Sequence, residues 1–331
     1  MQKTGRADIP MNETPFDIEG YYRQNFPPGM SEAKKQEMLS SLHQAMKRAP
    51  RTFSVTTRNK AEMTYKKMLD AIFLEMTKRT AGLTDPDEVV RALRFFAESP
   101  QFERICENAA QRMATMLAAG QKADWRAAAS ASSQGRKIYQ LLMNETTNTA
   151  VGQTITDIVA QNARLIKTVP QNMAGKIAEL VRKRRFEGQR PETILQEILE
   201  QQPHLREFEA RRIARTESAK ASTALTEARA EAMNLEFYIW RTAKDGDRVR
   251  KSHQIMEGVL CRWSEPPNPE EMAGERSYGS YHPGGIFNCR CFPQVIVALE
   301  DIPFPIKAHK GGAITTIPNL GALKKFYGLA A

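Results

Sequence analysis

Five residues able to bind a metal ion lie within 39 positions near the C-terminal end of the chain: His253, Cys261, His282, Cys289 and Cys291. The grouping is notable because the 331 residues contain only four cysteines and five histidines. Zinc is typically held by four thiolate or imidazole ligands in a tetrahedron. The sequence therefore predicts a structural zinc site formed by His253, Cys289 and Cys291. Cys261 is the expected fourth ligand because thiolate is the softer donor, and His282 is the alternative.

The Cys-x-Cys spacing of Cys289 and Cys291 constrains the backbone between them. In a straight strand, positions i and i+2 share a face and lie about 6.6 Å apart. Two thiolates on one tetrahedral ion lie about 3.8 Å apart, from zinc–sulfur bonds of about 2.3 Å. We therefore expect the backbone to bend at Arg290 and the strand to begin after Cys291. The surrounding segment is loop-rich and poor in apolar residues, so a metal crosslink would contribute much of its stability.

Two other interpretations of this cluster remain open. The cysteines can be buried core thiols, with the histidines on the surface or at helix caps. Alternatively, the metal can be catalytic, which requires an open coordination position and a nearby general base. Asp245, Asp247 and Glu257 are the carboxylates available for that role, although the two aspartates also suit a turn. The chain has no Ser/His/Asp order, phosphate-binding glycine loop or His-Glu-x-x-His motif.

The pattern of apolar residues predicts a mainly α-helical protein. A helical domain is expected over residues 30–234, followed by a small α+β module over 235–300 with strands near 236–243 and 289–299. Extended arms are expected at 1–29 and 301–331. Asp85 and Pro86 predict a helix start, and Cys106 is predicted to be a core residue. Further helices are predicted over 123–143, 148–168, 172–186, 191–201 and 204–234.

The chain carries a net charge of +10 and a pI near 9.4. Residues 162–190 contain eight basic residues against two acidic ones, the densest basic stretch. One interpretation is non-specific binding to DNA phosphates. The others are an acidic partner protein or a solvated helix face. The candidates for DNA contact are Lys176, Arg182, Lys183, Arg184, Arg185 and Arg190.

The chain shows no sign of membrane insertion or secretion. No run of about 18 apolar residues is present, and the N-terminal segment is polar. We therefore expect a protein of a reducing cytoplasm without a membrane partner, in which disulfides are disfavoured.

Three sequence segments together resemble the Mu F-like phage head morphogenesis, or minor capsid, family. They are "ARTESAKASTALTEAR" (214–229), "WRTAKDGDRVRKSHQIMEG" (240–258) and "HPGG…NCRC" (282–291). The resemblance covers about residues 190–300, and the loop "YHPGGIF" lacks the acidic residue that often follows Pro-Gly in the family. Its structural motif falls on Arg215, Glu217, Trp240, Asp247, Arg250 and Asn288.

The resemblance implies a non-enzymatic minor protein of a tailed phage head. Such a protein would lie at the portal vertex or in the capsid interior, assembling in the host cytoplasm. Its implied roles are head morphogenesis and DNA packaging or delivery, with portal, major capsid or scaffolding proteins and DNA as partners. Arg215 and Glu217 are expected to attach the long helix to the small module. The alternative is a metal-dependent DNA nuclease or DNA-binding module that uses the His/Cys cluster.

Overall fold

The computed structural model describes residues 26, 29–37, 39–40, 56–130, 134–244 and 248–329, without the side chains of 202–206. The arm predicted for residues 1–29 lies almost entirely outside these residues, and so does Asp247.

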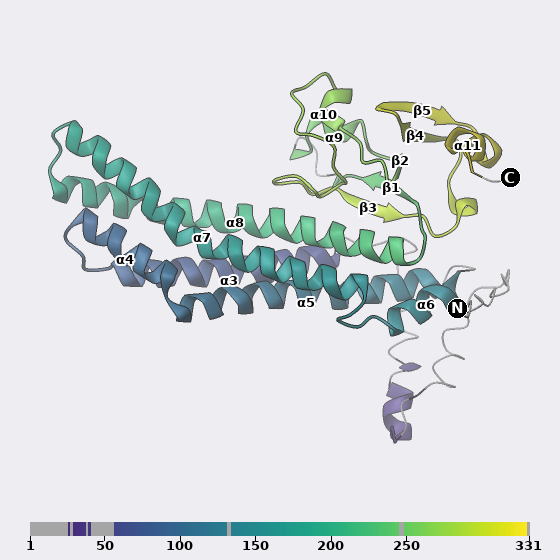
Figure 1. The fold of residues 1–331 in the computed structure, drawn as a ribbon, viewed down its shortest axis with the longest axis horizontal. Helices are drawn as coiled ribbons and strands as arrows, with labels where there is room; N and C mark the ends of the chain where they lie inside the picture. The colour runs from purple at the N-terminus through teal and green to yellow at the C-terminus, as the bar shows by residue number, and fades with distance from the viewer. Residues whose placement is uncertain are drawn as a thin grey trace, which may run out of the picture.

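The helical domain is an elongated rod in which α3, α5, α7 and α8 lie side by side (Figure 1). The helices of the rod are α3 (Thr56–Thr80), α4 (Pro86–Glu98), α5 (Pro100–Ser130), α6 (Gly135–Met143), α7 (Ala150–Phe186) and α8 (Pro191–Ala232). Helix α7 packs against α4, α5 and α8, and α3 packs against α5 and α8. The prediction of a mainly α protein with a small α+β module is confirmed.

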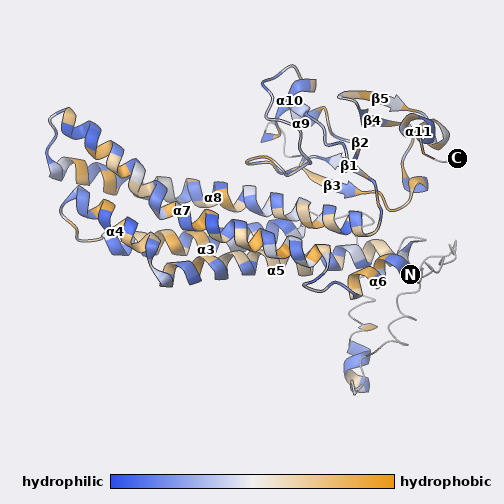
Figure 2. Cartoon of the chain, viewed as in Figure 1, coloured by the Kyte–Doolittle hydropathy of each residue, from blue (hydrophilic) through white to orange (hydrophobic). Residues whose placement is uncertain are grey.

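Local sequence signals explain where the helices begin and which side they bury. Asp85 accepts a hydrogen bond from the Asp87 amide at 3.1 Å and caps α4, with Pro86 in the first turn as predicted. Cys106 is 1% exposed and belongs to the rod core, as predicted. Hydrophobic positions recur along each long helix (orange in Figure 2), and those of the rod core face the neighbouring helices.

Among the described residues, no helix is both long enough and apolar enough to span a membrane.

Two pairs of predicted helices are continuous in the structure. The segments predicted as 148–168 and 172–186 form the single helix α7, which contains Pro170. An internal proline removes one backbone hydrogen bond and costs about 3 kcal/mol. Val169 and Pro170 are buried within the rod, so tertiary packing offsets that cost. The segments predicted as 191–201 and 204–234 likewise form the single helix α8.

The C-terminal module is built on a five-stranded sheet with the order β3-β1-β2-β4-β5. Its strands are β1 (Phe237–Arg241), β2 (Val259–Arg262), β3 (Phe292–Val295), β4 (Ile306–Lys310) and β5 (Ala313–Ile317), with short helices α9 (Lys251–Gln254) and α10 (Pro269–Met272) between strands. Strand β1 pairs antiparallel with β2 and β3, β2 pairs parallel with β4, and β4 pairs antiparallel with β5.

The extended tail predicted for residues 301–331 is wrong. Its described part supplies β4, β5 and helix α11 (Leu320–Tyr327), which complete the module. The physical reason is that β1 is buried on both faces. Tyr238 and Trp240 point into the core shared with the rod, while Phe237 and Ile239 need a cover on the other face. Ile306, Leu323 and Tyr327 from the tail provide that cover.

The module and the end of the rod share one hydrophobic core. Trp125 of α5 and Tyr139 of α6 lie in the same buried cluster as Tyr238, Trp240 and Cys261 of the sheet. The sheet is therefore packed on the rod, and this packing fixes the loops next to α8.

The rod contains a carboxyl group whose ionisation should lower stability. Burial raises the pKa of Asp124 from 3.8 to about 6, and the hydrogen bond donated by the Thr57 hydroxyl at 3.2 Å partly opposes this. The folded state therefore binds this proton more tightly than the unfolded state, so the group's stabilising contribution is complete below about pH 4 and is lost as the pH rises through 6.

We expect Asp124→Asn to raise the thermal unfolding midpoint relative to the unmutated chain at pH 7, and to give no gain at pH 4. The matched control is Asp157→Asn on the exposed side of α7, which should leave the midpoint unchanged at both pH values. Thermal denaturation followed by circular dichroism tests this, and an equal gain at pH 4 and 7 would contradict it.

Candidate metal centre

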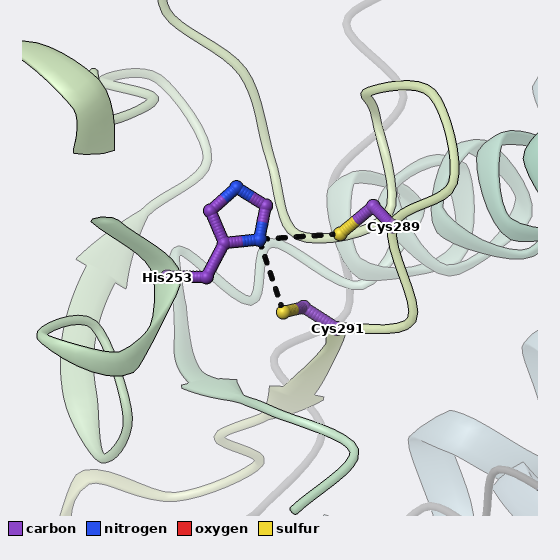
Figure 3. Close-up of side chains that lie close together, drawn as sticks. All are labelled: His253, Cys289 and Cys291. Atoms are coloured by element: carbon purple, nitrogen blue, oxygen red, sulfur yellow. Dashed lines mark hydrogen bonds between the residues drawn. The ribbon is translucent and has the colours of Figure 1, made fainter. Parts of the chain in front are cut away.

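His253, Cys289 and Cys291 form a buried cluster of metal-binding groups (Figure 3). The Nδ1 atom of His253 lies 3.6 Å from the Cys289 sulfur and 3.4 Å from the Cys291 sulfur. The three side chains are 2%, 3% and 2% exposed. The cluster could hold a metal ion, since its ligand atoms all lie within 4.8 Å of one another.

The backbone reaches this geometry by the bend expected between the two cysteines. Cys289, Arg290 and Cys291 have no regular secondary structure, and β3 begins at Phe292, as predicted. Asn288, just before the bend, has a φ of +53°, a left-handed conformation that asparagine tolerates better than most residues. The loop thus turns both sulfur atoms toward the same imidazole.

The distances from the imidazole nitrogen to the two sulfurs fit a tetrahedral zinc ion. Bonds of about 2.3 Å to sulfur and about 2.05 Å to nitrogen place the two kinds of donor about 3.6 Å apart. The two sulfur–nitrogen distances are 3.6 and 3.4 Å. Two thiolates and an imidazole are also the ligand types that zinc prefers.

The imidazole of His253 is oriented by a buried hydrogen-bond chain. Its Nε2 lies 2.9 Å from the Tyr281 hydroxyl, which donates to the Glu270 carboxylate at 2.6 Å. Ser252 also donates to Glu270, at 3.2 Å, and Glu270 is 1% exposed. Because the tyrosine proton goes to Glu270, Nε2 of His253 must be the protonated ring nitrogen. Nδ1 then faces the sulfurs with a free lone pair, as a metal ligand requires.

The two thiols are strongly coupled. The hydrogen bond from Cys291 lowers the pKa of Cys289 well below its ordinary value, although burial opposes this shift. The hydrogen bond to Cys289 raises the pKa of Cys291, and burial raises it further. The ring of Trp240 covers His253 edge-on, with the ring centroids 5.5 Å apart.

Arg58 of α3 attaches the cysteine loop to the rod. Its guanidinium group donates to the backbone carbonyls of Cys291 and Arg290, each at 2.9 Å. The side chain is 5% exposed; burial lowers its pKa, and the nearby Cys289 sulfur and Glu62 carboxylate oppose that shift. A buried guanidinium that satisfies two loop carbonyls is a strong positional constraint.

Cys261 and His282, the expected fourth ligand and its alternative, both lie outside this group of donors. Cys261 is buried in β2, with its sulfur 3.7 Å from the Val259 carbonyl, and burial raises its pKa to about 12. Nδ1 of His282 lies 2.9 Å from the Tyr238 hydroxyl, and its Nε2 lies 3.3 Å from Glu227 of α8. The prediction rested on the closeness of these residues in the sequence. In the structure, Cys261 lies on β2 beside Val259, and His282 lies beside Tyr238 and Glu227.

One face of α8 supports the two loops that carry the motif residues. Thr216 accepts a hydrogen bond from the Asn288 amide at 3.0 Å, and Thr223 donates to the Pro283 carbonyl at 2.6 Å. Together with Glu227, these residues recur at spacings of seven and four, so they share one helix face. The "HPGG" and "NCRC" segments therefore meet because both rest on α8.

The expected roles of Arg215 and Glu217 in attaching α8 to the module are corrected. Arg215 pairs with Glu62 of α3 at 3.3 Å, and Glu217 pairs with Lys220 of its own helix at 3.3 Å. The contact with the module comes from Thr216 between them. On a helix, adjacent residues point in different directions, so only one of the three can face the loop.

The remaining motif residues have structural contacts. Arg250 donates to the Phe287 carbonyl at 2.9 Å and lies over the Phe287 ring, 4.4 Å from its centroid. Trp240 is fully buried in the sheet. Glu257, one of the carboxylates considered for catalysis, accepts hydrogen bonds from the Thr242 amide and hydroxyl instead. The other two, Asp245 and Asp247, lie outside the described residues.

The basic residues proposed for DNA contact fall into two groups. Lys176 pairs with Glu209 at 3.2 Å, whereas Arg184 makes a bidentate pair with Glu197, the shorter contact being 2.6 Å. Arg185 pairs with Asp87 at 2.7 Å. The other three are exposed and have no ion-pair partner within the described parts of the chain: Arg182, Lys183 and Arg190.

Several residues that hold the cluster were not identified from the sequence. They are Arg58, Thr223, Glu270 and Tyr281, and they are between 17 and 233 positions from the ligands they support. A buried carboxylate hydrogen-bonded to a tyrosine has no periodic signal. The one available indication was the family-like segment 214–229, which already contained Thr216 and Thr223.

Comparisons with known proteins agree with this arrangement. Residues 175–293 match the model of the family described as "Phage Mu protein F like protein". This segment runs from the last part of α7 into β3 and contains the whole α8 face and all three cluster residues. The resemblance seen in the sequence is thus confirmed for this segment, which covers less than half of the chain.

A curated relative from Haemophilus influenzae, described as an uncharacterized protein, is 29% identical over 141 residues. The alignment covers 43% of this chain, and the chain spans only 29% of that relative's length. No solved structure matched the chain.

The contact between the "HPGG" loop and α8 can be tested with two glycines of equal backbone conformation. Gly284 and Gly279 both have a φ of +91°. A Cβ atom on Gly284 would lie 2.7 Å from the Thr223 hydroxyl and 3.2 Å from the Ala219 carbonyl, whereas one on Gly279 would meet nothing within 4 Å.

Both Gly→Ala variants should lose about 1–2 kcal/mol from backbone strain. We expect Gly284→Ala to lose about 1–3 kcal/mol more through overpacking against α8. Denaturant unfolding of the full chain measures both values. Equal losses would show that the loop does not press on the helix.

Proposed function

We propose that the chain is a minor structural protein of a tailed phage head, acting in head morphogenesis and in DNA packaging or delivery. The observation that carries this proposal is the family match over 175–293, whose residues form a continuous unit of helix face, sheet and cysteine loop. The proposed location is the portal vertex or capsid interior, with assembly in the host cytoplasm. Portal protein and major capsid or scaffolding protein are the proposed partners.

The architecture supports a structural role. The rod presents long helical surfaces, and exposed aromatic side chains on it include Phe95, Phe186 and Phe208, which are 75%, 95% and 62% exposed. Large exposed apolar side chains are a common feature of protein-binding surfaces. Within the described residues, the carboxylates nearest the cluster are committed to structural hydrogen bonds, as Glu270 and Glu257 show.

Co-expression with the portal and major capsid proteins of a tailed phage that carries this chain tests this function. We expect the chain to co-sediment with portal rings or assembled heads, and to be protected from added protease inside closed heads. Gly284→Ala should reduce incorporation if an intact module is needed, whereas Gly279→Ala should not. Absence from both portal complexes and heads would contradict the proposal.

The nuclease alternative predicts a different result from the same preparation. The isolated protein, incubated with supercoiled plasmid and Mg²⁺ or Zn²⁺, should leave the DNA intact under the structural proposal. Nicking that disappears in His253→Ala would instead assign an enzymatic role to the His/Cys cluster.

We further propose that the exposed cations at the end of α7 and the start of α8 contact DNA non-specifically. Arg182, Lys183 and Arg190 are unpaired within the described residues, and phosphate contacts release counterions. Lys176, Arg184 and Arg185, which are held in ion pairs, contribute less to this surface.

Replacing Arg182, Lys183 and Arg190 together with glutamine should reduce the slope of log affinity against log salt by roughly 2–3. The matched control replaces three exposed lysines of α3: Lys60, Lys67 and Lys78. Fluorescence anisotropy with duplex DNA at several salt concentrations measures both slopes. Similar slopes for the two triple variants would assign the basic residues another role.

We also propose that the cluster of His253, Cys289 and Cys291 holds a structural zinc ion. The sulfur–nitrogen distances, the ligand types and the oriented His253 tautomer support this. When bound, zinc would tie α9 to the loop before β3, two segments of the module that share no strand pairing. Zinc binding energy would then contribute to folding of the module.

A further inference from the structure

A small cavity borders the His/Cys cluster. It has a volume of about 100 Å³, and its lining includes all three cluster residues. Its remaining walls come from the segment after β1 and from the cysteine loop, and they carry three arginines: Arg248, Arg250 and Arg290. The ligand groups are thus buried in the protein, yet one side of the cluster faces a space large enough for a water molecule or small ion.

The cluster supplies three of the four ligands that a tetrahedral zinc ion requires. Among the described residues, no other histidine, cysteine, aspartate or glutamate joins the group. Structural zinc sites are usually closed by four protein ligands, whereas a site with three leaves one position for water or another molecule. The cavity is lined by the same three residues.

The charges around the cavity favour an anion. A zinc ion with two thiolates and a neutral imidazole has no net charge. Arg248, Arg250 and Arg290 are among the residues that line the cavity, and the Arg58 guanidinium donates to the carbonyls of Cys291 and Arg290. Arg248 is exposed and has no ion-pair partner among the described residues. Guanidinium groups bind carboxylate and phosphate oxygens with good geometry.

We propose that His253, Cys289 and Cys291 hold zinc through three protein ligands, and that the fourth position faces this cavity and takes an anionic oxygen donor, a carboxylate or a phosphate. The inference rests on the zinc site proposed above and goes beyond a closed structural ion. It makes the site a place where the module can bind an acidic group.

Zinc and cobalt loading of the full chain tests the proposal. X-ray absorption at the zinc edge should show two sulfur ligands, with nitrogen and oxygen completing the shell. Loading with Co²⁺ should give one ion per chain with thiolate charge-transfer absorption. Cys289→Ala should abolish this absorption and Cys261→Ala should retain it, with circular dichroism confirming that both variants are folded.

Anion titrations then identify the fourth ligand. If the position is exchangeable, inorganic phosphate or acetate should shift the cobalt d–d bands saturably. Arg248→Gln should weaken that binding by about 3–10-fold, as expected for one partly exposed charge. Lys251→Gln removes an equal charge from an exposed site outside the cavity and should change nothing.

Three results would overturn the proposal. They are a third sulfur ligand in the zinc spectrum, bound cobalt that is insensitive to both anions, and failure of the folded chain to bind either metal. Because incorporation into heads is measured separately, loss of the metal site would leave the head-protein proposal standing, and a head-assembly failure would leave the metal site standing.

Discussion

The structure depends on how the irregular loop 282–291 satisfies its backbone hydrogen bonds. A buried backbone group without a partner costs about 1–3 kcal/mol, and this loop has no strand or helix of its own to supply partners. Side chains supply them instead. Thr223 and Thr216 of α8 bond to Pro283 and Asn288, while Arg58 of α3 bonds to the last two carbonyls before β3. The conformation of the loop therefore depends on hydrogen bonds from the helices of the rod.

This dependence explains why the ligand cluster and the helices form one unit. The two sulfurs are placed by contacts to α3 and α8, and the imidazole is placed by the chain through Tyr281 and Glu270. Neither half alone would bring the three donor atoms together. The family match includes both the supporting helix and the ligands. It contains α8, β1 and β2 and ends at residue 293, shortly after the cysteines.

The module also depends on residues beyond the family match. Strands β4 and β5 and helix α11 follow residue 293. Strand β4 pairs with β2, β5 pairs with β4, and residues of this segment cover the outer face of β1. Tyr327 donates to the His309 carbonyl at 2.8 Å and so ties α11 to β4. The inner face of the same sheet packs on Trp125 and Tyr139 of the rod. The sheet therefore lies between the rod and the C-terminal segment. One face of β1 is buried against the rod and the other against that segment.

The sequence by itself determined the local features. Apolar periodicity gave the helices, the start signals at Asp85 and Pro86 gave a correct boundary, and the Cys-x-Cys spacing gave the bend before β3, because each depends on residues close together in the chain. Only the tertiary structure decided which donors converge. It excluded Cys261 and His282 from the cluster, paired Arg184 and Arg185 with carboxylates, and drew the C-terminal segment into the sheet. These outcomes follow from contacts between residues distant in sequence, such as Arg58 with Cys291 and β2 with β4, and no local pattern of spacing encodes them.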